Sequence, residues 1–213
     1  KEISIELAWK EKKIERRSVL RAVFSVSDII LEKRQNFRVS HWFYADAIAN
    51  WYKLPLWGKQ FWPMCEKYMR NFLGHGNDIM HTPIFTPPTD QAKYPCQLLI
   101  VRQPKKGQYT FGFHRVKQWV DLARKCGADY FSWSHFFPPR GGFTASMVYE
   151  TKDGKEIPLW SRELEGTSDR YRNFLKQLMP QYKRFLDREN LLDISYFHIS
   201  DEPYGPICLE QYK

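Results

Sequence analysis

The 213-residue chain has few cysteines and no long apolar run. Its 4 cysteines are far apart and form no Cys-x-x-Cys pair, which excludes a small disulfide scaffold and argues against structural zinc. No apolar stretch approaches the roughly 18 residues that cross a bilayer, so we expect no membrane span. The first residues lack the apolar core of a secretory signal. Any signal peptide would lie upstream, so the compartment stays open.

Sequence motifs for several common chemistries are also absent. There is no GxGxxG or GxxxxGK[ST] motif for a nucleotide, no GxSxG elbow and no HExxH zinc motif. The 6 histidines show no ligand spacing. A metal site built from His81, His135 and His198 stays an alternative, because all three lie on predicted strands. We nevertheless expect no metal and no cofactor.

The chain is basic and rich in aromatic residues. It has 33 Lys+Arg against 24 Asp+Glu, a net charge of +9, and 16% aromatic residues. The aromatic content excludes a disordered chain. Basic residues are mixed with acidic ones, as in residues 10–17, which is typical of a solvated surface. Nucleic-acid binding stays an alternative, but we expect no nucleic-acid partner.

From residue 37 onward, apolar strand patterns alternate with amphipathic helical patterns. Strand patterns cover residues 37–44, 79–85, 130–137 and 194–200. Helical stripes cover residues 61–72, 116–123 and 171–186. This order predicts an α/β fold with a parallel sheet and right-handed crossovers. Two further segments, 97–113 and 143–160, are predicted hairpins that would project over the carboxyl ends of the strands.

The chain is shorter than the roughly 250 residues of a (β/α)8 TIM-type barrel. We expect residues 39–213 to form only about the first half of such a barrel. Residues 1–38 show strand alternation, as in Ile3, Ile5 and Leu7, and no helical face. We expect them to be the end of an N-terminal β-sandwich followed by a linker. A half barrel leaves strand edges unpaired, so we expect this chain to be inactive by itself.

Asp201-Glu202 are the strongest candidates for catalysis. They directly follow a predicted strand and precede Pro203. One protonated carboxyl group can protonate a leaving oxygen while an ionised neighbour stabilises positive charge, which is the chemistry of glycosidic bond cleavage. The alternative is that both residues begin a helix, where acidic side chains favour the dipole. The residue types alone leave both interpretations open.

Aromatic and polar residues near the other strand ends form a candidate sugar-binding set. Sugars present apolar CH faces surrounded by hydroxyl groups, so their sites need aromatic platforms with polar groups between them. The expected substrate-binding residues are Trp42, Tyr44, Asp46, His81, Trp133, His135, His198 and Tyr204. The alternative for Trp42 and Trp133 is that both are core residues whose indole N–H groups make hydrogen bonds within the protein.

Several segments together resemble the catalytic domain of glycoside hydrolase family 123. The matching segments are HWFYADAIA at 41–49, TPIFTPP at 82–88, YTFGF at 109–113, YFSWSHFF at 130–137 and YFHISDEP at 196–203. They occur in the order of this bacterial family and cover about residues 38–206. The resemblance implies a (β/α)8 barrel behind a β-sandwich.

The resemblance also implies an activity, namely β-N-acetylgalactosaminidase by substrate-assisted retention. It assigns Glu202 as the general acid/base and Asp201 as the residue that orients the 2-acetamido group. The expected partner is a glycan that contains an N-acetylhexosamine. Alternatives are a glycosidase of the same fold with another specificity, or a carbohydrate-binding protein without activity. The linkage and the oligomeric state stay open.

Overall fold

The computed structural model describes residues 2–29, 37–87, 95–139, 141–202 and 205–206. The chain divides into two compact units, Lys1–Lys33 and Arg34–Lys213. None of the helices in the described residues is both long and apolar enough to cross a membrane.

The first unit contains one antiparallel hairpin, β1 (Glu2–Glu11) and β2 (Ile14–Val23). Every side chain described between residues 3 and 29 is exposed. The hairpin agrees with the strands predicted in this segment, and their assignment to the end of a β-sandwich stays a prediction. Alternation with period 2 predicts strands with one apolar face, but it does not specify what covers that face.

The second unit is built on a small parallel sheet with the strand order β3-β6-β9. The strands are β3 (Ile79–Thr82), β6 (Tyr130–Trp133) and β9 (Ser195–Phe197). All residues of β3 are buried, which agrees with the apolar runs that parallel strands require. The sheet therefore forms the centre of the unit.

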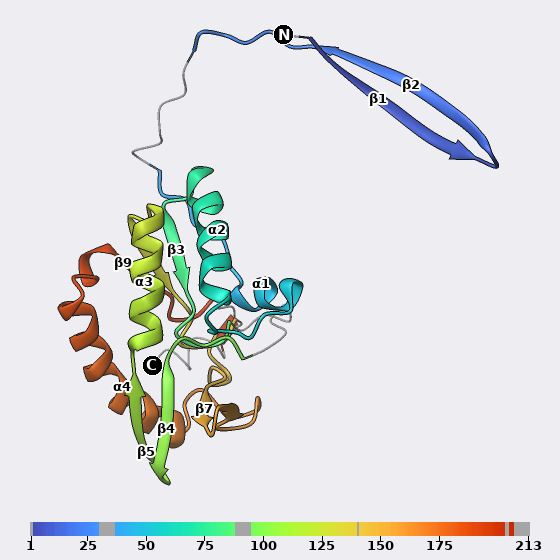
Figure 1. Cartoon of the computed structure of the whole chain (residues 1–213). Coiled ribbons are helices and arrows are strands. Elements are labelled where there is room, and N and C mark those ends of the chain that lie inside the picture. The colour runs from blue at the N-terminus through green and yellow to red at the C-terminus, as the bar shows by residue number, and fades with distance from the viewer. Residues whose placement is uncertain (1, 30–36, 88–94, 140, 203–204, 207–213) are drawn as a thin grey trace. The chain divides into compact units, whose positions relative to one another are not determined.

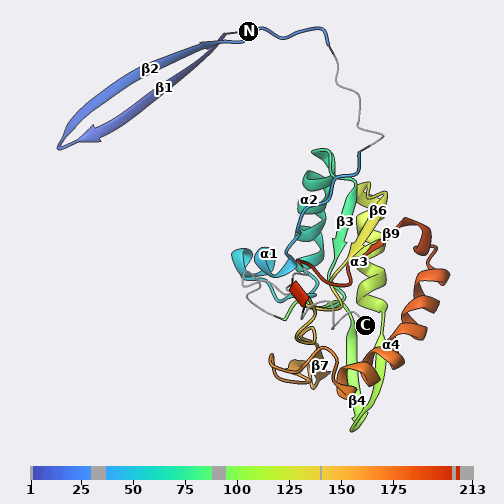
Figure 2. The same cartoon turned by 180° about the vertical axis from the view of Figure 1, so that it is seen from behind.

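Helices supply most of the remaining core. They are α1 (Ala45–Tyr52), α2 (Phe61–Gly74), α3 (His114–Cys126) and α4 (Asp169–Arg188), with a 3₁₀ turn, η1, at Leu192–Ile194. The three longer helices confirm the predicted stripes. Figure 1 shows α2 and α3 beside β3, and the view from behind in Figure 2 brings β3 and β6 to the front. Pro180 lies inside α4, which changes direction along its length in both views.

Two hairpins leave this framework, as predicted. They are β4 (Ile100–Lys105) with β5 (Gln108–Gly112), and β7 (Tyr149–Lys152) with β8 (Lys155–Pro158). The first is fastened to α4, because Asn173 Nδ2 and Gln177 Nε2 donate to the Gly107 carbonyl at 2.7 and 2.9 Å. The second turns at Asp153-Gly154, where both residues have positive φ, as a two-residue hairpin turn requires.

The expected half of a (β/α)8 barrel is wrong. The described residues form a sheet of three short parallel strands and three separate two-stranded antiparallel sheets, with no closed barrel. Residues 37–44 form no named strand and make only an isolated bridge from Ser40 to Ile79. Their backbone is held instead by Asp78, which accepts from the Val39 N–H at 2.7 Å and pairs with Arg38 at 3.0 Å. Alternation of strands and helices predicts parallel strands, whereas closure also needs matched tilt and stagger.

Candidate active site

The carboxyl ends of the three parallel strands meet at one edge of the sheet. Beyond β6 and β9 the two segments stay paired, since the Phe136 N–H donates to the His198 carbonyl at 3.1 Å and the Phe137 N–H donates to the Ile199 carbonyl at 2.9 Å. Ser200 Oγ donates to the Pro138 carbonyl at 3.1 Å. These bonds hold the segment before Asp201 against the segment that follows β6. In open α/β sheets, this edge is where ligands bind.

A pocket of about 340 Å³ opens at this edge. Its volume lies in the range of small-molecule sites. Six of the predicted site residues line it, namely Trp42, His81, Trp133, His135, His198 and Asp201. We refer to it as the histidine pocket. Neither hairpin contributes to its lining among the described residues.

Aromatic rings are arranged closely on one side of the histidine pocket. The Trp42 indole lies nearly parallel to the His135 ring, with centroids 5.5 Å apart and planes at 12°. Tyr44 stacks on Trp42 at 5.9 Å, again with planes at 12°, and His81 lies 4.8 Å from Trp42. Trp42 is 42% exposed, so it presents aromatic surface to solvent. An exposed, fixed indole can pack against the apolar face of a sugar.

Two histidines of the pocket, His81 and His135, are buried, whereas His41 and His198 are exposed. His135 Nε2 and His198 Nδ1 are 3.1 Å apart and share a hydrogen bond. Burial, with a further contribution from the neighbouring histidines, lowers the pKa of His81 to about 3. Burial and His198 together lower the pKa of His135 to about 4, although Asp201 opposes this shift. Both rings are therefore neutral near pH 7 and can act as hydrogen-bond donors or acceptors.

The acidic pair lies at the rim. Asp201 lines the pocket, and both Asp201 and Glu202 are exposed. Glu202 has φ of 48°, and its N–H donates to Asp201 Oδ1 at 3.0 Å. The chain thus leaves the extended conformation at Glu202, which frees the two carboxylates from the opposite directions that a regular strand would impose. Tyr204 lies outside the described residues.

Three of the predicted substrate-binding residues do not lie at the rim of the histidine pocket. Trp133 is fully buried, and its indole N–H donates to Ser195 Oγ at 2.8 Å, as the alternative core interpretation expects. Asp46 is buried within α1, away from the lining, where it adds to the effect of burial in raising the pKa of the Cys96 thiol. Tyr44 contacts the pocket through Trp42.

The side chains of the histidine pocket do not form a metal centre. Within the described residues, no group of three or more His, Cys, Asp or Glu is placed to hold a metal ion. The alternative of a metal site built from His81, His135 and His198 is therefore not supported by the described residues.

Sequence reasoning missed part of the lining. Ser40, His41, Ser132 and Tyr196 also line the pocket. Ser132 and Tyr196 face each other across β6 and β9, so they could have been found by pairing the predicted strands in register. His41 directly precedes Trp42, and this position beside a candidate aromatic platform could have indicated that His41 also lines the pocket.

Comparison with known proteins identifies the family. The sequence model of the glycoside hydrolase 123 catalytic domain matches residues 42–213. The chain therefore belongs to glycoside hydrolase family 123. The matched range includes the acidic pair and the lining of the histidine pocket apart from Ser40 and His41. No curated protein matches the chain.

A solved structure is similar in fold. It is a family 123 glycoside hydrolase from Clostridium perfringens, described for glycolipid glycan hydrolysis, with a TM-score of 0.66 and 14% sequence identity. The alignment covers 99% of this chain and 37% of that structure. This chain thus spans little more than a third of that enzyme's length.

Proposed function

We propose that the protein is a retaining exo-glycosidase that acts on N-acetyl-β-galactosaminides by substrate-assisted catalysis. The observation that carries the proposal is the family match over residues 42–213, which includes an acidic pair beside an aromatic, histidine-lined pocket. Carbohydrate is the substrate class that the family implies.

In the proposed reaction, the carbonyl oxygen of the substrate's 2-acetamido group attacks the anomeric carbon. The bond from that carbon to the leaving oxygen breaks, and the Glu202 carboxyl group donates its proton to the leaving oxygen. The result is an oxazolinium ion, whose positive charge Asp201 stabilises while it orients the acetamido group. Glu202, now a carboxylate, takes a proton from water as the water attacks the anomeric carbon and restores the acetamide with retained configuration.

The other site residues bind the sugar in this proposal. Trp42 supplies the aromatic platform, and His198 supplies a polar group beside it. His81 and His135 are neutral and buried, so they favour hydrogen bonding to an uncharged sugar over binding of an anion. Tyr44 stacks on the platform, and Trp133 lines the pocket. Asp46 and Tyr204 stay predicted substrate-binding residues.

Replacement of Glu202 tests the proposal. In the protein at its natural full length, Glu202→Gln is expected to lower kcat by about 10²–10⁴-fold for an alkyl N-acetyl-β-galactosaminide, the range of general acid catalysis. The loss should be smaller for a nitrophenyl glycoside, whose leaving group needs less protonation. The matched control is Glu165→Gln, an exposed glutamate outside the histidine pocket.

Equal turnover of both substrates by the Glu202 variant and the control would contradict the role of Glu202. A panel of aryl glycosides and a thiazoline mimic of the oxazoline test the finer claims. We expect tight thiazoline inhibition, which Asp201→Asn should weaken. Turnover of sugars that lack the acetamido group would favour another specificity, and sugar binding with no hydrolysis would favour a binding protein.

A further inference from the structure

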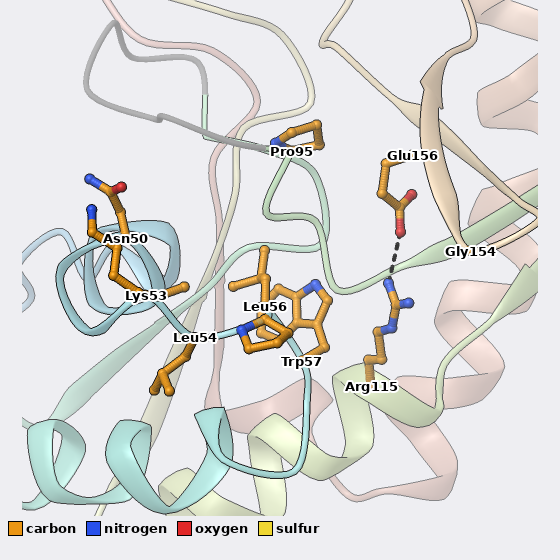
Figure 3. A pocket seen from close by; sticks show the side chains of 11 residues that line it. Asn50, Lys53, Leu54, Leu56, Trp57, Pro95, Arg115, Gly154 and Glu156 are labelled. Atoms are coloured by element: carbon orange, nitrogen blue, oxygen red, sulfur yellow. Dashed lines mark hydrogen bonds and ion pairs between the residues drawn. The ribbon is translucent and has the colours of Figure 1, made fainter.

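A second pocket lies at the other end of α1 from Trp42. It has a volume of about 440 Å³ and shares no lining residue with the histidine pocket. Its walls come from the end of α1, the following segment 53–57, the start of α3 and the β7–β8 hairpin. Figure 3 shows Asn50 and Lys53 at one end, Arg115 and Glu156 at the other, and Leu56 and Trp57 between them.

Trp57 occupies a conformation that a large side chain rarely adopts. The Gly58 N–H donates to the Pro55 carbonyl at 3.0 Å and closes a turn in which Trp57 has φ of 63°. Glycine or asparagine is usual at such a position, and a bulky residue there is strained. Contacts with Phe61 and Trp119 fix the ring, at centroid distances of 5.2 and 6.1 Å. The fixed indole presents an aromatic wall whose N–H makes no hydrogen bond among the described residues.

The two ends of the pocket differ in charge. Arg115 Nη1 pairs with Glu156 Oε1 at 3.0 Å, with both side chains only about 20% exposed, and Glu156 also accepts from Thr151. That end is electrically balanced. At the other end Lys53 has no ion-pair partner among the described residues, so the lining carries one uncompensated positive charge. The pocket therefore combines an apolar middle, a neutral polar end and a cationic end.

We propose that this second pocket binds a sugar unit that carries a carboxylate or a sulfate. The sugar's apolar face packs on Trp57 and Leu56, its hydroxyl groups meet the Arg115–Glu156 end, and its acidic group meets Lys53. The choice of a sugar rests on the proposed function, whereas the charge and the amphipathic lining come from the pocket itself. α1 is about 12 Å long, so the two pockets are close enough for one extended glycan to be recognised by both.

Matched glycosides test the proposal by NMR titration of the full chain. Methyl glucuronide and a 6-sulfated methyl glucoside carry the two acidic groups, and methyl glucoside is their neutral counterpart. We expect an acidic glycoside to shift the indole N–H signal that Trp57→Phe removes. Lys53→Gln should weaken its binding about ten- to a hundredfold, the effect of losing a charge-assisted hydrogen bond. Lys59→Gln removes the same charge from an exposed position outside the pocket and should leave binding unchanged.

The acidic glycoside that binds more tightly identifies the acidic group. Equal weakening by Lys53→Gln and Lys59→Gln would mean attraction to general surface charge and would overturn the proposal. Absence of any shift in the Trp57 signal, or equal binding of the neutral glycoside, would also overturn it. None of these glycosides carries an N-acetylhexosamine. Binding that depends on Lys53, without any hydrolysis of N-acetylgalactosaminides, would therefore contradict the proposed function and leave this inference intact.

Discussion

His135 joins the aromatic platform to the acidic pair. It stacks on Trp42, shares a hydrogen bond with His198 and lies close enough to Asp201 for that carboxylate to influence its pKa. A charged imidazolium at this position would have to lose most of its hydration. The neutral ring thus preserves both the packing of Trp42 and the placement of His198.

The buried histidines predict a pH dependence of stability. The pKa of His135 is about 4 in the folded protein and near 6.5 when unfolded, so the unfolded state binds the proton first as the pH falls. The free energy of unfolding is therefore unaffected by His135 above pH 6.5. It decreases as the pH falls from 6.5 toward about 4, because only the unfolded state takes up the proton in this range. The measurement is the free energy of unfolding by urea at several pH values between 4 and 6.5. His135→Gln should reduce its change with pH, whereas replacement of the exposed His114 by Gln should not. Identical slopes for the two variants would contradict this assignment.

Gln97 is a buried side chain that helps to attach the β7–β8 hairpin to the core. Gln97 is 1% exposed; its Nε2 donates to the carbonyls of Leu99 and Tyr149 at 2.8 Å, and its Oε1 accepts from the Tyr149 N–H at 2.8 Å. The Gln97 amide thus bonds to both the N–H and the carbonyl of Tyr149, as the backbone of a neighbouring strand would. Because all three bonds are buried or partly buried, their loss leaves backbone groups without partners.

Gln97→Leu is therefore expected to lower the free energy of unfolding by about 2–4 kcal/mol, as two or more buried polar groups lose their partners. Chemical denaturation measures this change. The same substitution at Gln118, an exposed residue of α3, should change stability by less than about 0.5 kcal/mol. A similar small effect at Gln97 would show that water replaces the lost bonds.

At the element scale, periodicity predicted the longer helices and both hairpins, but not α1. α4 has a wide apolar stripe and a Ser168 cap, and the β7–β8 turn has the Asp-Gly signal. α1 has only 8 residues, and Tyr44 at its start makes no side-chain cap bond. Its apolar residues continue a strand-like pattern from Phe37. Six candidate residues that line the histidine pocket could be found because they lie on or beside predicted strands. Which histidines are buried depends on packing that periodicity does not contain.

The chain has a net charge of +9, and several basic side chains of the described residues lie beside acidic ones. Basic residues pair with nearby acids, as in Arg70 and Lys125 with Glu66, and Lys183 with Asp187. Such exposed pairs add little stability, but they reduce the local positive potential. This pairing favours our prediction that the chain has no nucleic-acid partner.

We accordingly expect no retention of the chain on immobilised duplex DNA at physiological salt. A protein that contacts many phosphates binds with an affinity that falls steeply as salt rises. If the chain is retained on DNA at low salt and this retention decreases only gradually as the salt concentration rises, the binding would reflect net charge alone. A steep dependence, equivalent to six or more phosphate contacts, would contradict this interpretation.

Whole-molecule architecture was the least predictable level. Strand and helix order implied parallel strands, and the sheet of β3, β6 and β9 is parallel. Closure into a barrel does not follow from that order, because it depends on how many strands join and how they tilt. Strands of three or four residues contain too little pattern to specify either property.

The β7–β8 hairpin supplies Gly154 and Glu156 to the second pocket and nothing to the lining of the histidine pocket within the described chain. Changes in the length or sequence of this hairpin can therefore alter one recognition surface while the other keeps its shape. A family built on this plan could diversify by exchanging a surface loop, with the buried strands and their histidines left as a constant framework. Specificity and chemistry would then evolve on separate parts of the same chain.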